Sequence, residues 1–442
     1  MTEFKKRRDA FMEKIGDAVA VFPSAPQVIR SNDGHYPYRQ DSDFYYLTGF
    51  AEPESVLVLA PSHPQTKTVI FVRPRDRDRE IWEGKRLGVE AAAAALSVDA
   101  AYPLAELDER LPALLDGSDN LYYGMNGGHE FIRRIIRHVK QARITRRRAD
   151  NAALNILDPS PILHEMRTIK SAADIAGMRR AVEISCAGHL AAMRYARPGM
   201  HEYEVQAIVD YVFASRGAES NSYPSIVAGG NNTTYLHYTA NRDRIPDDAL
   251  VLIDAGAEVD FYNGDITRTW PISGKFSAEQ RAVYDIVLAA NRAAIELCKP
   301  GVTFNTTIND AAQRIMVEGL IDLKLVKGPA DAVLEGGAHR PFLPHRVGHF
   351  LGYDTHDVGF YRQKGDWRPL AAGMVVTIEP GLYVGYDLDV DPRFKGIGVR
   401  IEDDVLVTER GRENLSEELP KDADEIERTM EAGRRSKEPL LA

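Results

Sequence analysis

The sequence predicts a protein of the mixed α/β (α+β) class with two domains, and three observations carry that prediction. In the N-terminal part, apolar runs of strand length alternate with helical patterns, as they do in α/β domains. In the C-terminal part, long helices alternate with hairpin-like strand pairs. Between residues 142 and 161 both patterns weaken, and Pro159 and Pro161 bracket a short polar stretch. We therefore predict an N-terminal α/β domain over residues 1–165 and a second domain over residues 166–442.

The N-terminal elements follow from hydrophobic periodicity. Each predicted strand is a short apolar run that ends at or near a proline, and these runs cover residues 18–22, 55–60 and 68–72. An alanine-rich segment predicts one helix and an amphipathic segment predicts another, over residues 90–96 and 130–140.

The C-terminal elements begin at Ser171, a predicted N-cap followed three residues later by Asp174, in a relative of the Ser-x-x-Glu capping box. Two of the long helices end at a Pro-Gly pair, and a short charged helix is predicted after Pro420. The long helices are predicted over residues 172–196, 202–216, 278–298 and 307–320.

Composition excludes several classes of protein. The chain has 442 residues, with 55 Lys+Arg against 65 Asp+Glu, and this net charge of −10 argues against a nucleic-acid partner. Only Cys186 and Cys298 occur, which excludes a disulfide framework and a cysteine-based zinc site and suits a reducing compartment. No apolar run approaches the roughly 18 residues of a membrane span, and the N-terminus lacks a secretory apolar region. We expect a cytoplasmic protein without a membrane partner.

Common catalytic motifs are also missing. The chain has no Gly-x-x-x-x-Gly-Lys-Ser/Thr loop and no Gly-x-Ser-x-Gly elbow, and its Gly-x-Gly segment at residues 396–398 lacks the third glycine of a dinucleotide fingerprint. The three His-Glu pairs lack the second histidine of a zincin helix. Nucleotide, serine-hydrolase and zincin chemistry therefore have no support.

Two aspartates stand out in the C-terminal domain. Asp254 ends the apolar run LVLIDAG, and Asp265 lies in GDITRT. A hairpin that turns near residues 259–260 would place the two side chains opposite each other on one face, with Cβ atoms about 5 Å apart. A turn at residues 263–264 would break that pairing. We prefer the first turn and interpret Gly264 as a bulge or bend.

Three further groups occur in similarly apolar settings: Glu379 after the run MVVTI, Glu402 after GIGVRI, and His349 in PHRVGHFLGYDTHD. Taken singly, such residues are usually turn formers, solvated side chains or hydrogen-bonded core histidines. Together, four carboxylates in strands this apolar would cost several kcal/mol each if buried without cations. Two divalent cations would balance their charge. Carboxylate-rich ligation with one imidazole favours Mn²⁺, and Zn²⁺, Co²⁺ or Fe²⁺ also fit.

These residues and their flanks resemble the dinuclear site of the pita-bread metallopeptidases, a family that includes methionine aminopeptidase, prolidase and aminopeptidase P. The matching segments are LIDAG, GDITRTWP, HRVGHFLGYDTHD, TIEPGLY and GIGVRIEDD. The N-terminal segments RSNDGHYPYRQDSDFYYLTGFAEPE and EIWEGKRLG resemble the N-terminal domain of bacterial aminopeptidase P. The likeness runs from about Phe4 to about Met430, and its departures include Arg346 and the segment Tyr361–Trp367.

The resemblance implies a pita-bread catalytic domain that holds two divalent metal ions. Asp254 and Asp265 would bind one ion, with Asp265 bridging to the second. His349 and Glu379 would bind the second ion, with Glu402 also bridging. Glu379 would in addition relay a proton between the attacking water and the departing proline nitrogen.

The resemblance also implies roles outside the metal site. His237 and His356 would donate hydrogen bonds to the substrate and the developing oxyanion. The remaining candidates for substrate binding are His345, Arg400, Tyr383 and Trp82, of which Trp82 would reach the active site of a neighbouring subunit. Three structural alternatives stay open: Arg400 pairing only with Glu402 or Asp404, Tyr383 serving only in packing, and Trp82 acting as a surface anchor in a protein that is not an oligomer.

The implied activity is that of an Xaa-Pro aminopeptidase, which removes the first residue from peptides with proline at position two, in a homo-oligomer (a tetramer or a dimer). One alternative is a prolidase, restricted to Xaa-Pro dipeptides. Another is a catalytically inactive pita-bread binding module, which the full ligand set disfavours. Hydrolysis of organophosphate esters is a further side activity of some relatives, and no residue of this sequence tests it.

Overall fold

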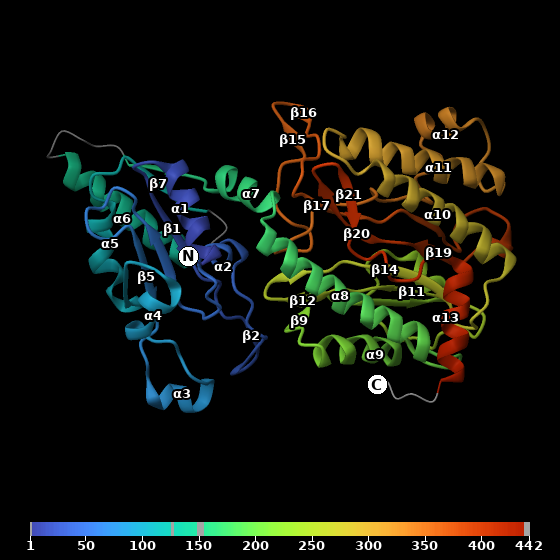
Figure 1. The fold of residues 1–442 in the computed structure, drawn as a ribbon, viewed down its shortest axis with the longest axis horizontal. Coiled ribbons are helices and arrows are strands. Elements are labelled where there is room, and N and C mark those ends of the chain that lie inside the picture. The colour runs from blue at the N-terminus through green and yellow to red at the C-terminus, as the bar shows by residue number, and fades with distance from the viewer. Residues whose placement is uncertain (1, 125–127, 148–153, 437–442) are drawn as a thin grey trace. The chain divides into compact units, whose positions relative to one another are not determined.

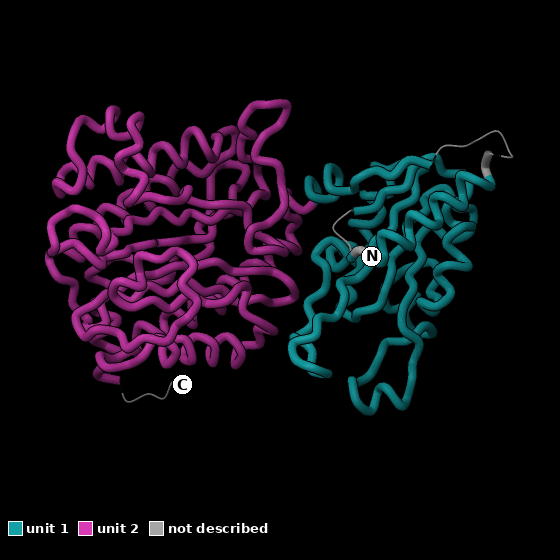
Figure 2. The backbone as a smooth tube through the Cα atoms, turned by 180° about the vertical axis from the view of Figure 1, so that it is seen from behind, with its two compact units in different colours: residues 1–166 teal, residues 167–442 magenta. Residues whose placement is uncertain are grey.

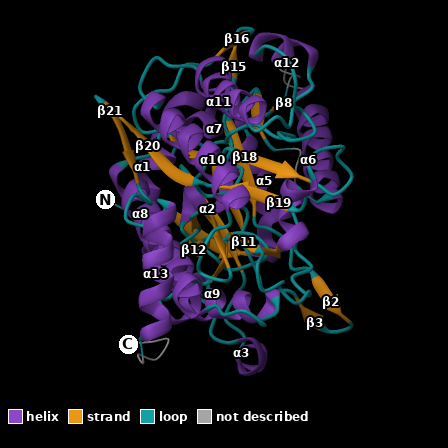
Figure 3. Ribbon diagram, turned by 90° about the vertical axis from the view of Figure 1, so that its right-hand side faces the viewer, coloured by secondary structure: helices purple, strands orange, loops and turns teal. Residues whose placement is uncertain are grey.

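The computed structural model describes residues 2–124, 128–147 and 154–436. The chain divides into two compact units, residues 1–166 and residues 167–442 (Figure 2). Helices and strands are mixed in both units (Figure 3), and the predicted α/β (α+β) class is confirmed.

The first unit is built on a six-stranded mixed sheet with the order β6-β5-β4-β1-β7-β8. Its central strand β1 pairs antiparallel with β4 and parallel with β7. The strands are β1 (Val19–Pro23), β4 (Val56–Leu59), β5 (Thr68–Val72), β6 (Ala100–Pro103), β7 (Asn120–Tyr122) and β8 (Asn155–Leu157), with a separate hairpin of β2 (Ile29–Ser31) and β3 (Gly34–His35). The helices are α1 (Glu3–Ile15), α2 (Ser42–Thr48), α3 (Arg77–Glu83), α4 (Val89–Leu96), α5 (Leu107–Leu115) and α6 (His129–Arg147). Helix α7 (Ser160–Thr168) begins in the first unit and ends in the second.

The sequence predicted this unit well because its strands are continuously apolar. Strands β1, β4 and β5 and helices α4 and α6 occur where the apolar runs and helical patterns placed them. The residues of β4 and β5 are buried along their whole length, since helices cover the sheet. Leu107, Leu111 and Ile135 of α5 and α6 belong to the same core cluster as the strands.

The second unit combines long helices with short antiparallel strand pairs. The helices are α8 (Ala172–Tyr195), α9 (Glu202–Ser215), α10 (Ala278–Leu297), α11 (Asn309–Asp322), α12 (Ala330–Gly336) and α13 (Ala423–Arg435). The strands are β9 (Ser220–Asn221), β10 (Ile226–Gly229), β11 (Leu250–Asp254), β12 (Ala257–Val259), β13 (Tyr262–Asn263), β14 (Thr267–Pro271), β15 (Arg362–Gln363), β16 (Asp366–Trp367), β17 (Val375–Ile378), β18 (Gly381–Val384), β19 (Ile397–Arg400), β20 (Asp403–Thr408) and β21 (Gly411–Asn414).

Two helix pairs flank these strands. Helix α8 packs against α9 and against β12 and β13, whereas α10 packs against α11 and against β17, β18 and β19 (Figure 1). Ser171 caps α8 in a capping box with Asp174, as predicted. Helix α11 begins two residues later than predicted, because a π-helical turn at Phe304–Ile308 precedes it. The strands that carry the candidate ligands therefore lie between two pairs of helices.

The hairpin that carries the two aspartates turns at Asp260 and Phe261, which have φ of 49° and 69°. Positive φ at both central residues is the mark of a type I′ two-residue turn. Strand β11 consequently pairs with β14 so that Asp254 lies opposite Thr267, not Asp265. The predicted direct pairing of the aspartates is wrong by two residues, and the turn at residues 263–264 does not form. A displacement of two residues keeps both side chains on one face of the hairpin.

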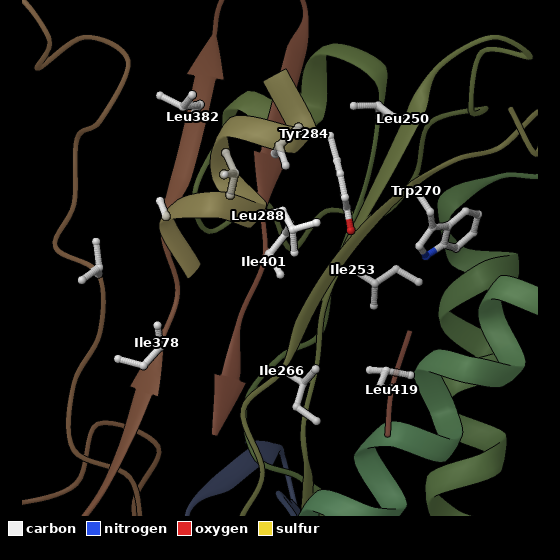
Figure 4. Packing of buried hydrophobic residues seen from close by; sticks show 14 of the residues in the cluster. Leu250, Ile253, Ile266, Trp270, Tyr284, Leu288, Ile378, Leu382, Ile401 and Leu419 are labelled. Atoms are coloured by element: carbon white, nitrogen blue, oxygen red, sulfur yellow. The ribbon is translucent and has the colours of Figure 1, made fainter. Parts of the chain in front are cut away.

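The main hydrophobic core of the second unit lies where α10 meets the strands. Tyr284 and Leu288 of α10 belong to one core cluster with Ile401, Leu382, Ile253 and Ile266 (Figure 4). The apolar residues that alternate with the candidate ligands thereby anchor the backbone in the core, while the ligands themselves line a cavity.

None of the helices in the described residues combines the length and the apolar character needed to cross a membrane.

Candidate metal centre

Five candidate ligands converge although 148 positions of sequence separate the first from the last. Asp254 ends β11, Asp265 precedes β14, Glu379 follows β17, and Glu402 lies between β19 and β20. One ligand atom each from Asp265, His349 and Glu402 lies within 4.8 Å of the other two. Such a spacing lets the three side chains share one ion.

Backbone hydrogen bonds set the positions of these side chains. The Glu402 N–H donates to the Thr267 carbonyl at 3.0 Å, which ties the β19–β20 junction to β14. The Glu379 N–H donates to the Val347 carbonyl at 2.9 Å. The Thr377 N–H donates to the His349 carbonyl at 2.9 Å. The residues at strand ends are thus held by the strands themselves, which gives the site its rigidity.

The cluster lies in a cavity of about 920 Å³ within the second unit. The cavity contains all five candidate ligands and also His237, His345, His356 and Arg400. Other lining residues are Ser222, Tyr223, Pro224, Ile226, Leu236, Thr239, Arg346, Gly348, Asp354 and Thr355. A concave site with a few convergent polar groups is the usual form of a small-substrate site.

Burial and mutual repulsion raise the pKa values of Asp265, Glu379 and Glu402. Burial raises the pKa of Glu402 well above its ordinary value, and the charges of Asp265 and Glu379 raise it further. Burial likewise raises the pKa of Asp265, and Glu379 reaches a pKa of about 7. Burial opposes the charged form of His349, but its contact with Asp265 outweighs this and raises its pKa to about 9. Such a cluster calls for additional positive charge.

The donor set fits hard divalent cations. The Nδ1–H of His349 donates to the Phe350 carbonyl at 2.9 Å, which leaves the lone pair of Nε2 available for a metal. This Nε2 lies 3.4 Å from Asp265 Oδ2 and 3.7 Å from Glu379 Oε1. An imidazole oriented by a backbone carbonyl beside several carboxylates is a typical arrangement for metal ligands.

Arg400 crosses the site to the first aspartate. Its guanidinium donates to Asp254 Oδ2 at 2.6 Å, to the Tyr383 hydroxyl at 2.9 Å and to Thr267 Oγ1 at 3.1 Å. The alternative in which Arg400 pairs only with Glu402 or Asp404 is therefore wrong. The charge of Arg400 is directed at Asp254 because β19 lies beside the end of β11.

Tyr383 links Arg400 to His345. The Nδ1–H of His345 donates to the Arg346 carbonyl at 2.7 Å, so its Nε2 accepts from the Tyr383 hydroxyl at 2.7 Å. Burial and the charge of Arg400 lower the pKa of His345 to about 4, which keeps the ring neutral. The Tyr383 hydroxyl thus orients His345, so the role of Tyr383 is not packing alone. Its own atoms do not line the cavity.

The two remaining histidines are exposed at the cavity wall. The ring centroids of His356 and His349 are 4.2 Å apart, and burial together with the charge of His349 lowers the pKa of His356. His237 lies after the 3₁₀ turn Gly230–Thr234. Trp82 belongs to α3 in the first unit, and 87% of its surface is exposed, which is unusual for a large aromatic residue.

Sequence reasoning missed three residues that contact the ligands. The Tyr223 hydroxyl bonds both Asp254 and Asp265, the latter at 2.6 Å. Thr267 Oγ1 donates to Glu402 Oε2 at 2.7 Å. Asp404 accepts the Asp265 backbone N–H at 3.0 Å. Asp404 could have been found from its place in GVRIEDD, but a tyrosine before Pro224 carries no such signal.

Comparisons with known proteins agree with this site. Residues 176–409 match metallopeptidase family M24, and residues 4–122 match the N-terminal domain of aminopeptidase P. The chain is 44% identical to Xaa-Pro aminopeptidase of Escherichia coli, over 98% of each chain.

Solved structures give the same result. An aminopeptidase of Pseudomonas aeruginosa, PepP, superposes with a TM-score of 0.95 at 42% identity, over 98% of each chain. Aminopeptidase P from E. coli with the inhibitor Pro-Leu has a TM-score of 0.94 at 43% identity, over 98% of this chain and 99% of that one. The chain therefore belongs to metallopeptidase family M24, with a pita-bread catalytic domain preceded by an aminopeptidase P type N-terminal domain, and it is a hydrolase.

Proposed function

We propose that the chain is an Xaa-Pro aminopeptidase that hydrolyses the N-terminal Xaa-Pro bond of peptides. The observation that carries this proposal is the convergence of four carboxylates and one oriented imidazole in an open cavity. The full-length identity to an Xaa-Pro aminopeptidase supports the same activity.

Asp254, Asp265, His349, Glu379 and Glu402 would hold two divalent ions, with Mn²⁺ favoured by the oxygen-rich donors. When bound, these ions would polarise the scissile carbonyl and lower the pKa of a water molecule. The acidic end of the cavity near Asp254 would bind the free amino group of the substrate, which restricts cleavage to N-termini.

The chain's own residues would handle the proton and the developing charge. Glu379 would take a proton from the attacking water on its carboxylate and deliver it to the departing proline nitrogen. His237 and His356 would donate hydrogen bonds to the substrate and the oxyanion, an interaction of about 3–4 kcal/mol per donor.

Proline specificity would come from the far side of the cavity. The Xaa-Pro bond is a tertiary amide without an N–H, so a site that grips that N–H cannot serve it. His345, oriented by Tyr383, would form one wall of the pocket for the proline ring, and Arg400 would complete it.

The N-terminal domain, residues 1–165, would restrict substrate length and supply oligomer contacts. We propose a cytoplasmic homo-oligomer, a tetramer or a dimer, in which the exposed Trp82 of one subunit approaches the cavity of another. Aromatic side chains are favoured at such interfaces.

The test compares Ala-Pro-Ala with Ala-Ala-Ala and with the dipeptide Ala-Pro, using protein supplied with Mn²⁺. We expect cleavage of Ala-Pro-Ala and none of Ala-Ala-Ala. The Asp265→Asn variant should lose almost all turnover while its circular dichroism is unchanged. Asp260→Asn is the matched control, because Asp260 is exposed in the turn at a positive φ that asparagine tolerates. Cleavage of the dipeptide alone would make the protein a prolidase, and retained turnover in Asp265→Asn would refute the metal assignment.

A further inference from the structure

The wall of the active-site cavity carries an arginine, Arg346, to which the proposed mechanism gives no role. Arg346 follows His345 directly and lines both the active-site cavity and a neighbouring groove of about 640 Å³. The groove is also lined by Gln313 of α11, Leu334 of α12 and Arg340, which follows α12. Arg346 therefore marks the point where the cavity continues toward the surface.

The segment Tyr361–Trp367 contains a hairpin that contacts Arg346 from one side. Strands β15 and β16 pair Arg362 with Trp367. The Arg346 guanidinium carbon lies 5.6 Å from the centroid of the Trp367 ring, and that of Arg362 lies 3.9 Å from it. Both distances are in the range of cation–π contacts. Trp367 thus contacts both arginine side chains.

The hairpin is itself anchored to the metal-site loop. The Tyr361 hydroxyl accepts the Phe350 N–H at 2.9 Å, and the two rings stack with centroids 4.6 Å apart. Phe350 is the residue after His349. The position of Arg346 is therefore coupled to the site through a short chain of contacts.

Within the described parts of the chain, none of the ion pairs involves Arg346, whereas Arg314 in the same groove pairs with Asp331 at 2.6 Å. An arginine stays charged at all physiological pH values and presents a planar fork that matches a carboxylate. A ring on one face leaves the edge of that fork free to donate.

We propose that Arg346 binds a carboxylate located after the proline of the substrate, and that the enzyme therefore prefers short or acidic peptides. This inference rests on the proposed function, because it uses the direction in which the peptide lies. With the amino group at Asp254 and the proline ring at His345, the next residue would lie one Cα step of about 3.8 Å beyond the proline, in the part of the cavity that Arg346 lines beside His345. The carboxylate is either the C-terminus of a tripeptide or an Asp or Glu side chain of a longer peptide.

The test measures kcat/KM of the Mn²⁺-loaded enzyme on four peptides: Ala-Pro-Leu, Ala-Pro-Leu-amide, Ala-Pro-Glu-amide and Ala-Pro-Lys-amide. The free tripeptide separates the C-terminal source of the carboxylate from the side-chain source. We expect a preference of about fivefold for one or both carboxylate peptides over Leu-amide, which is ~1 kcal/mol, and Lys-amide should be the poorest. The gain should appear in KM, because Arg346 contacts substrate remote from the scissile bond.

Variants separate recognition from a merely structural contact. Arg346→Gln should remove the carboxylate preference, so that kcat/KM on Ala-Pro-Leu and on Ala-Pro-Glu-amide becomes equal to kcat/KM on Ala-Pro-Leu-amide in the same variant. Arg346→Lys should keep part of the preference. Arg362→Gln removes the other cation on Trp367 and lines neither cavity, so it should keep the full preference. The inference about Arg346 would be overturned, and the proposed function left intact, by either of two results: an unchanged carboxylate preference in Arg346→Gln, or no carboxylate preference in the wild-type enzyme. Failure to cleave any Ala-Pro peptide would overturn the proposed function together with it.

Discussion

Asp357, the residue after His356, offers a sharp test of how the catalytic loop is held. Its side chain is 1% exposed and accepts from Arg167 at 2.6 Å and from Lys170 Nζ at 2.9 Å. Lys170 is itself fixed by its backbone N–H, which donates to the Gly373 carbonyl at 2.8 Å. We consider the substitution Asp357→Asn, which keeps the shape of the side chain and removes its charge.

The expected cost follows from burial. Removing one partner of a buried ion pair typically costs about 3–5 kcal/mol, because the remaining charge is left uncompensated. Here two cations lose their shared carboxylate, while Asp354 still accepts from Arg167 at 2.7 Å. We therefore expect a loss near ~3–4 kcal/mol. At about 2 °C per kcal/mol for a large domain, the melting temperature should fall by roughly 6–8 °C.

The assay is thermal unfolding of the full chain followed by circular dichroism, together with kcat of the metal-loaded enzyme. Asp354→Asn is the matched control: it contacts the same arginine but its side chain is 37% exposed, so we expect less than ~1 kcal/mol. The kcat of Asp357→Asn should also fall, since His356 is its neighbour. Equal shifts in both variants, or a shift below ~2 °C for Asp357→Asn, would refute the reasoning.

The pH dependence of this effect has a definite sign. Burial alone would raise the pKa of Asp357, but the charges of Lys170 and Arg167 outweigh it and hold the pKa below its ordinary value. A depressed carboxyl pKa contributes stability that is present above the unfolded pKa of about 3.9 and is lost as the pH falls through the folded value. The difference between wild type and Asp357→Asn should stay constant from pH 5 to 8 and shrink below about pH 4.

Three further predictions concern other parts of the molecule. Gly256→Ala should prevent stable folding of the second unit, because the new Cβ would lie 1.7 Å from the Gly264 carbonyl oxygen. As a control, the Cβ of Gly411→Ala would meet nothing within 4 Å, so this variant should change stability by less than ~1 kcal/mol. Expression level and melting temperature check both variants. Tyr383→Phe removes two hydrogen bonds of the site, those to His345 and Arg400. It should therefore lower kcat/KM by at least about tenfold, with a stability loss of only ~1–2 kcal/mol. An unchanged kcat/KM would show that Tyr383 serves packing alone. Trp82→Ala should leave the melting temperature of the isolated subunit unchanged, because Trp82 is 87% exposed. It should lower either the molecular mass of the oligomer, measured by light scattering, or the enzymatic activity. No change in either quantity would argue against an interface at α3.

The sequence determined much of the architecture because its signals are local. Apolar runs fixed β1, β4 and β5, and the capping residue Ser171 fixed the start of α8. These signals depend only on neighbours in the chain, such as alternation of side chains or one hydrogen bond across three residues. The ligand residue types were visible for the same reason, since a carboxylate in an apolar strand is anomalous wherever the strand lies.

Tertiary structure decided which groups meet, and sequence could not. The register of the aspartate hairpin depended on positive φ at Asp260 and Phe261, which no side-chain pattern announced. The partner of Arg400 is Asp254, a residue 146 positions away, because two strands end side by side. Tyr223 touches both aspartates although its own segment is unremarkable in composition. Long-range electrostatic contacts are properties of the packed chain, because they depend on distances and burial that arise only when the strands are assembled.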